Sequence, residues 1–267
     1  MTRGALARSI LVAALVSGCC TLPRLAPLPR LTGAAAPPAR LLQLLSRLRA
    51  AQASVRTLKV VHRITLTSRG GASSGALRGL LAVRRPDAYR LRVLGPAGLT
   101  AMDLVWSGGR FVLDVPPSGV HLVGDERTPR RRLHGVPVDG LARAFLGTYE
   151  AARASLVEDG RWAVLTLEER DGARRVLYVR PGDAVVAIDA RFEDGRETLR
   201  LTHADRRVVS GVALSHRVRC DMPPEGLSAT IEVDRYDVNP PLPDAAFALP
   251  AGPAAALWRP LLAADRL

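Results

Sequence analysis

The clearest candidate for catalytic chemistry is the pentapeptide Gly71-Ala72-Ser73-Ser74-Gly75, which matches the G-x-S-x-G pattern of serine hydrolases. In those enzymes the serine is exposed on a sharp turn between a strand and a helix. Here the residues on both sides alternate in hydrophobicity as strands do, so the pentapeptide is typical of a hairpin loop rich in Gly and Ser. A hydrolase that uses Ser73 remains an alternative.

The histidines and cysteines supply no second catalytic or metal-binding pattern. His62 falls on the apolar side of an expected strand, His121 and His134 precede an expected helix, and His203 and His216 lie in or beside later strands. No Ser/His/Asp set, carboxylate pair or Cys/His cluster has a spacing typical of catalysis or metal ligation. We therefore expect a protein that is not an enzyme and that needs no cofactor and no metal.

The first twenty residues carry chemistry of another kind. Arg3 and Arg8 flank the start of a chain whose short apolar run, Ile10–Val16, is far below the roughly 20 residues of a membrane-spanning helix. A basic start, a short apolar core and small residues are typical of a secretory signal peptide. The sequence Val16-Ser17-Gly18-Cys19 follows the lipobox pattern, and chains that carry it resemble bacterial lipoproteins. The resemblance implies that Cys19 is acylated and becomes the first residue of the mature protein.

This lipidation would fix the location of the protein. Two or more acyl chains, such as palmitate, hold a protein firmly on a bilayer, at about 0.8 kcal/mol for each buried CH2. Cys20 stands where enterobacterial lipoproteins retained in the inner membrane carry aspartate, which favours an outer-membrane anchor facing the periplasm. Residues 1–18 would be the signal peptide and the proline-rich residues 19–39 a tether. An ordinary cleaved signal peptide with incidental cysteines is the alternative.

The charge of the chain limits the classes of partner that it is expected to bind. The formal net charge is +13 and arginine supplies almost all of it, with Lys59 the single lysine. The arginines are spread along the chain and aromatic residues make up 4% of it, which argues against nucleic-acid binding. Anionic lipid headgroups fit the charge; a plain compositional bias towards arginine is the other explanation.

The rest of the chain predicts one mainly β domain over residues 40–252, followed by a short tail or helix over 253–267. The leucines of Arg40–Val55 form one broad stripe, which predicts an amphipathic helix, and Pro137–Leu146 is expected as a second, short helix. Elsewhere apolar residues alternate with polar ones between Asp-Gly and Pro-Gly turns, so we expect an antiparallel meander of about ten or eleven strands.

Such a sheet has a wider apolar face than one or two short helices can cover. Two sheets packed as a sandwich would solve this, and so would an unclosed half-barrel whose helical lid leaves a hydrophobic cavity. Residues on the expected strands that would line this cavity are Leu81, Leu91, Leu104, Trp106, Phe111, Leu113, Ile188, Phe192, Leu214 and Val218.

An apolar hairpin turn is a second candidate contact with lipid. Leu94–Thr100 joins two expected strands through Pro96, Ala97, Gly98 and Leu99. The two apolar side chains of this turn, Ala97 and Leu99, are either partly covered or free to dip into a membrane or a bound acyl chain.

The order of these features resembles the LolA/LolB-type lipoprotein carriers of bacteria. The resemblance rests on a helix, three strands, the turn GPAGLT, the segment DLVWSGGRFVLDVPPSG and the near-terminal YDVNPPLPDAAFALPAG at 236–252. It implies an unclosed β-barrel with an α-helical lid over a hydrophobic cavity. In the anchored member, LolB, a leucine on a protruding Pro-Leu-Gly turn is important for inserting lipoproteins; here Ala97 stands in its place and Leu99 follows two residues later.

The resemblance implies a monomeric outer-membrane lipoprotein that binds acyl chains of lipoproteins or lipids and helps deliver them to the outer membrane, with a soluble LolA-like carrier as a partner. The alternative is a structural or assembly lipoprotein with the same fold and a filled core, acting through protein contacts.

Overall fold

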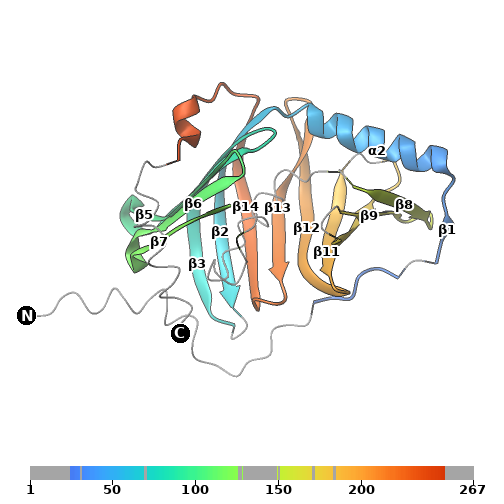
Figure 1. The fold of residues 1–267 in the computed structure, drawn as a ribbon, viewed down its shortest axis with the longest axis horizontal. Coiled ribbons are helices and arrows are strands. Elements are labelled where there is room, and N and C mark those ends of the chain that lie inside the picture. The colour runs from blue at the N-terminus through green and yellow to red at the C-terminus, as the bar shows by residue number, and fades with distance from the viewer. Residues whose placement is uncertain are drawn as a thin grey trace, which may run out of the picture. The chain divides into compact units, whose positions relative to one another are not determined.

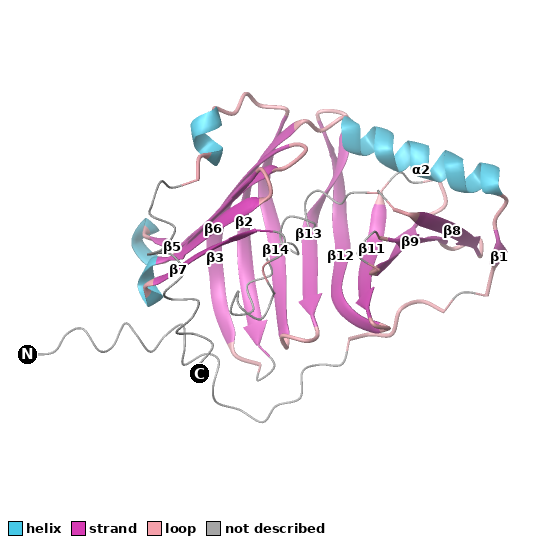
Figure 2. Cartoon of the chain, viewed as in Figure 1, coloured by secondary structure: helices cyan, strands magenta, loops and turns pink. Residues whose placement is uncertain are grey.

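The computed structural model describes residues 25–30, 32–68, 71–125, 128, 149, 151–169, 172–182 and 185–249. These residues form two compact units. Their helices and strands are drawn in Figures 1 and 2. Unit 1 contains the described residues of 56–138 and those from Glu232 onward, and unit 2 contains those of 21–55 and 139–231. Residues 1–24, Pro137–Leu146 and 250–267 lie outside the description, so the expected signal peptide, second helix and C-terminal tail are not addressed by it.

Unit 1 is a run of antiparallel hairpins. Its strands are β2 (Thr57–Ser68), β3 (Ser73–Arg84), β4 (Ala88–Leu94), β5 (Thr100–Ser107), β6 (Arg110–Val115) and β7 (Val120–Asp125). Short 3-10 turns are η1 (Pro96–Gly98), η2 (Pro116–Ser118) and η4 (Asp244–Phe247). Strand β3 begins at Ser73 directly after the turn, so the G-x-S-x-G pentapeptide joins two strands and does not lead into a helix.

Unit 2 places one long helix beside a second set of antiparallel strands. The helix is α2 (Pro38–Ala53), which starts two residues before the predicted one because Pro38 fits the first helical position. The strands are β1 (Ala34–Ala35), β8 (Arg153–Glu158), β9 (Ala163–Glu168), β10 (Arg174–Val179), β11 (Val186–Glu193), β12 (Arg196–Val209) and β13 (Val212–Met222). Strand β14 (Leu227–Val238) contributes its first half to unit 2 and its second half to unit 1.

The hydrogen-bonded strand order is β1-β8-β9-β10-β11-β12-β13-β14-β2-β3-β4-β5-β6-β7. Within the described residues the first and last strands of this order do not pair with each other, so the sheet is unclosed. This confirms the predicted fold class, mainly antiparallel β with a helical cover. In the part of the chain that the structure describes, the sheet has fourteen strands, more than the ten or eleven predicted, and one of the additional strands, β7, contains His121.

Part of the expected tether is held against unit 2. The Tyr178 hydroxyl donates a hydrogen bond to the carbonyl oxygen of Pro29 at 3.3 Å. The Arg200 guanidinium donates another to the carbonyl oxygen of Ala26. These two side chains fix the segment 25–30 on the sheet, so the proline-rich stretch is not a free linker along its whole length.

The last residues before α2 extend the sheet. Strand β1 pairs antiparallel with β8, and the Ala36 amide donates to the Leu156 carbonyl oxygen at 2.9 Å. At Gly33 an added Cβ would lie 2.0 Å from the carbonyl oxygen of Glu158, so this close approach requires glycine. The last residues of the stretch 19–39, predicted as a tether, therefore lie in a strand and at the start of a helix.

Candidate functional site

The apolar face of unit 1 is built from one row of side chains that crosses six strands. Each member lies opposite the next in the register, and we call this set the leucine row: Val60, Leu81, Leu91, Leu104, Leu113 and Leu122. All six are at most 2% exposed, and Leu104 and Leu113 are 0% exposed. No water-sized space therefore adjoins these two leucines, and a ligand could reach them only after protein atoms that cover the row have moved.

A second row, one step along the strands, is aromatic. The Trp106 ring stacks between those of Tyr89 and Phe111, with centroid distances of 6.1 and 5.9 Å and interplanar angles of 4° and 5°. Opposite Phe111 the sheet carries Gly124, where an added Cβ would lie 2.5 Å from the Phe111 ring. Tyr89 and Phe111 are buried whereas Trp106 is half-buried, so this stack is the better-exposed part of the face.

The structure does not bring the predicted cavity residues of unit 2 onto one face. Val218 is buried and shares its side of β13 with the half-buried Leu214. Ile188 and Phe192, both half-buried, lie on the opposite side of the sheet, because the register of β11 shifts between its pairings with Tyr178 and Val179. A β-bulge of this kind reverses the alternation that the sequence pattern assumes.

In unit 2 the helix covers its part of the sheet directly (Figure 1). Leu44, Leu45 and Leu48 of α2 pack on β8–β11 in one cluster of buried side chains, which we call the apolar cluster: Leu44, Leu45, Leu48, Leu156, Ala163, Leu165, Leu167, Leu177, Val179 and Val186. The predicted stripe of leucines thus forms a lid that is seated on the strands.

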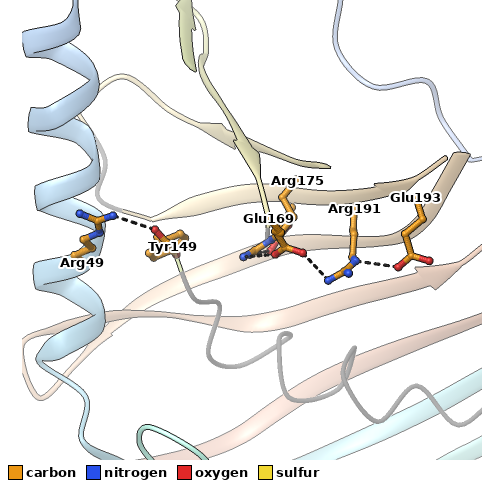
Figure 3. Close-up of polar contacts among 7 residues, drawn as sticks. Arg49, Tyr149, Glu169, Arg175, Arg191 and Glu193 are labelled. Atoms are coloured by element: carbon orange, nitrogen blue, oxygen red, sulfur yellow. Dashed lines mark hydrogen bonds and ion pairs between the residues drawn. The ribbon is translucent and has the colours of Figure 1, made fainter. Parts of the chain in front are cut away.

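Beyond the apolar cluster, the same face of unit 2 carries a buried ion network that the sequence did not predict (Figure 3). The Arg175 side chain is 1% exposed, and its guanidinium contacts the Asp189 carboxylate at 2.5 and 3.2 Å. Glu169 bridges two guanidinium groups, at 3.6 Å from Arg175 Nη1 and 2.6 Å from Arg191 Nη1. Arg191 also contacts Glu193 at 3.0 Å.

In this network the charge of the buried Arg175 is stabilised by carboxylates instead of by water. Burial alone would lower the pKa of Arg175, but the nearby carboxylates of Asp189 and Glu169 more than offset it and raise that pKa above its ordinary value. Arg175 therefore stays charged, and the network forms a polar limit to the apolar cluster on this face. The sequence did contain a sign of this buried charge. Arg175 and Leu177 are two residues apart in β10, so their side chains lie on the same face of the sheet.

The turn predicted to contact lipid is exposed. Residues Pro96–Gly98 form a 3-10 turn, closed by hydrogen bonds of 2.8 Å from the Gly95 amide to the Leu99 carbonyl oxygen and of 3.2 Å from the Gly98 amide to the Gly95 carbonyl oxygen. The Leu99 side chain is 72% exposed, and Ala97 has a positive φ of 58°. The geometry presents Leu99 to the solvent.

The described residues lack two features that would have suggested other kinds of site. Among them, no three His, Cys, Asp or Glu side chains gather as a metal ion would require. In the same part of the chain, no helix combines the length and the apolar character needed to cross a bilayer.

Comparison with known proteins adds the fold class. No protein-family profile and no curated sequence matches this chain. The solved structures that are similar to it include the following three. A DUF1329 family protein from Desulfovibrio piger has a TM-score of 0.60 and 12% identity over 82% of this chain and 98% of its own. A LolA superfamily protein from Nitrosomonas europaea has a TM-score of 0.58 and 15% identity, over 78% of this chain and 97% of its own.

The third is a putative outer membrane lipoprotein-sorting protein domain from Vibrio parahaemolyticus, with a TM-score of 0.56 and 13% identity over 78% of this chain and 97% of its own. At these identities the likeness concerns the fold. The chain therefore has a LolA-like fold, as the order of its sequence features predicted.

Proposed function

We propose that this protein is a lipid-anchored protein of the bacterial outer membrane that binds acyl chains of lipoproteins or lipids and helps deliver them to that membrane. The observation that carries the proposal is the leucine row, an unbroken apolar surface across six strands in a fold shared with a lipoprotein-sorting domain. The protein would act as a monomer that receives its cargo from a soluble LolA-like carrier.

The burial of the row defines how such a carrier would work. Since Leu104 and Leu113 have no exposed surface, an acyl chain would reach them only by taking the place of the protein atoms that cover them. Each Å² of apolar surface that the acyl chain buries contributes about 25 cal/mol, so exchange between sites would follow the difference in buried area. The exposed Leu99 would enter the bilayer during delivery.

Binding can be tested through Trp106, which is half-buried in the aromatic stack. Full-length protein in mild detergent is mixed with a diacylated lipopeptide whose acyl chains carry bromine, a short-range quencher of tryptophan fluorescence. We expect strong quenching in the wild type and much weaker quenching in Trp106→Phe, in which Trp162 and Trp258 are the remaining tryptophans.

An unbrominated lipopeptide is the control for changes of environment. Equal, weak quenching in both proteins would contradict the carrier proposal and favour the structural or assembly lipoprotein, whose interior admits no acyl chain.

The anchor has a separate test. In cells that express the full chain and are fed a palmitate analogue with a clickable alkyne, we expect label on the wild type and on Cys20→Ala, and none on Cys19→Ala. The lipobox places the acylated thiol at Cys19, and Cys20 is the matched control one residue away. A wild type without label would identify residues 1–18 as an ordinary cleaved signal peptide.

A further inference from the structure

The segment 25–30, which we call the strap, is held by two side chains that donate hydrogen bonds to its backbone. Two of its six residues are proline, and none lies in a helix or a strand. Tyr178 donates to the Pro29 carbonyl oxygen at 3.3 Å, and Arg200 donates to the Ala26 carbonyl oxygen. Because proline has no N–H, such a segment offers mainly hydrogen-bond acceptors, and the side chains that hold it supply the donors.

The strap lies on the side of unit 2 opposite the apolar cluster. Tyr178 follows Leu177 of that cluster in β10, and neighbouring residues of a strand point to opposite sides of the sheet. The register places Arg200 on the same side as Tyr178, through Ile188 and Ala190 of β11. Tyr178 is 4% and Arg200 is 8% exposed, so their hydrogen bonds to the strap are shielded from water.

A third hydrogen-bond donor lies beside Tyr178 and has no acceptor. The Trp162 ring meets the Tyr178 ring edge-on, with centroids 5.9 Å apart and an interplanar angle of 90°. Among the described residues, none accepts a hydrogen bond from the buried Trp162 Nε1. Proline-rich segments are commonly bound against aromatic side chains. Trp162, Tyr178 and Arg200, which we call the donor set, therefore fit an extended segment that contains proline and presents carbonyl oxygens.

The strap itself is only loosely held. Within the described residues its two hydrogen bonds to Tyr178 and Arg200 are the only ones that it makes. Three of its residues are exposed and three are half-buried, so none is fully enclosed. Its main advantage is the covalent link to the domain, which keeps its local concentration high. A second segment of the same kind can displace it if that segment is also held close to the domain.

We propose that the donor set binds the extended, proline-containing segment of a cargo lipoprotein, and that the strap occupies the donor set until cargo arrives. The inference rests on the proposed function, because bound acyl chains would hold the cargo segment close to the domain, as the covalent link holds the strap. Cargo is then recognised twice, through its acyl chains and through backbone carbonyl oxygens of the residues that follow them.

Two lipopeptides test whether the protein recognises such a segment. The probe is a fluorescent diacylated lipopeptide with the sequence of residues 19–30, and the matched control has alanine in place of both prolines. Fluorescence anisotropy measures their binding to the full-length protein in mild non-ionic detergent. We expect the proline probe to bind about tenfold more tightly, because two prolines reduce the conformational entropy that the free segment loses on binding. Equal affinities would overturn the inference.

Substitutions in the protein test whether the probe and the strap compete. Pro27→Ala with Pro29→Ala weakens the strap alone, so the proline probe should bind this double variant about tenfold more tightly than the wild type. An unchanged affinity would show that the strap does not occupy the site of the probe, and would overturn the inference.

The same double variant reveals the contribution of the donor set, because a strongly held strap would lose the same hydrogen bond as the probe. In this background Tyr178→Phe should raise the Kd of the proline probe about fivefold, the effect of one lost hydrogen bond. Tyr149→Phe is the matched control, since Tyr149 packs against the apolar cluster on the other side of the sheet, and it should leave the Kd unchanged. Equal effects of the two substitutions would contradict the assignment to the donor set.

Failure of the proposed function gives a different pattern. In that case removal of the acyl chains from the probe does not change its affinity and brominated acyl chains do not quench Trp106, whatever the two prolines of the probe contribute.

Discussion

Asparagine in place of Asp189 is expected to lower the free energy of unfolding by about 3–5 kcal/mol, the usual effect of removing one partner of a buried ion pair. The Arg175 side chain is 1% exposed and that of Asp189 is 9% exposed, so water cannot replace the lost carboxylate. Glu169 stands 3.6 Å from Arg175 and also serves Arg191, so it compensates only in part. Urea unfolding at neutral pH measures the change.

Two controls separate the buried charge from other effects of the substitution. The double variant Arg175→Met with Asp189→Leu removes both charges and leaves the pair of Glu169 and Arg191 intact, so it should recover most of the lost stability. Asp237→Asn breaks the exposed pair with Arg235 and should cost no more than about 1 kcal/mol. Equal losses for Asp189→Asn and Asp237→Asn would show that the network does not carry the stability assigned to it.

Acid is expected to destabilise the protein through His62, by up to about 3 kcal/mol between neutral pH and pH 4. Burial lowers the pKa of His62 from 6.5 to about 4, and the nearby charge of Asp234 opposes this only in part. Between these two values the unfolded chain binds a proton that the folded chain does not, so stability is present above pH 6.5 and is lost as the pH falls towards 4. His203, whose pKa burial also lowers to about 4, titrates in the same range.

The measurement is the free energy of unfolding as a function of pH in the wild type and in His62→Gln. The variant should have the shallower slope between pH 6.5 and 4, while the contribution of His203 remains. The His62 ring occupies the space over Gly79, across the strand pair, where an added Cβ would lie 2.2 Å from the ring nitrogen Nε2. Identical slopes in the two proteins would contradict the role given to His62.

The elements that the sequence predicted best are those whose pattern is local. The leucine stripe of α2 and the turn Asp194-Gly195 follow from the residues themselves, and both turn residues have the positive φ that such a hairpin needs. The burial of Arg175 in β10 was harder to predict, because this charged residue occupies a position of the face that also carries Leu177. From the sequence alone, a buried charged residue looks like one that faces solvent, because the opposite charges that pair with it are not known.

The candidate site was predicted only in part for the same physical reason. The leucine row follows from period-two alternation, which fixes the side of each strand. The pairing of Arg175 with Asp189 and Glu169 depends on strand register and on residues from separate strands and a loop. The bulge in β11 moved Ile188 away from the side expected for it, and no feature of a single sequence announces such an insertion.

The docking of residues 25–30 on Tyr178 and Arg200 limits the length of chain that can separate the folded protein from its proposed lipid anchor. With acyl chains on Cys19, as proposed, seven residue steps separate this residue from Ala26, the first docked residue, and even a fully extended chain of that length spans only about 24 Å. The folded body would then stay near the leaflet that anchors it, and any donor of cargo from the opposite side of the envelope would have to travel the remaining distance itself.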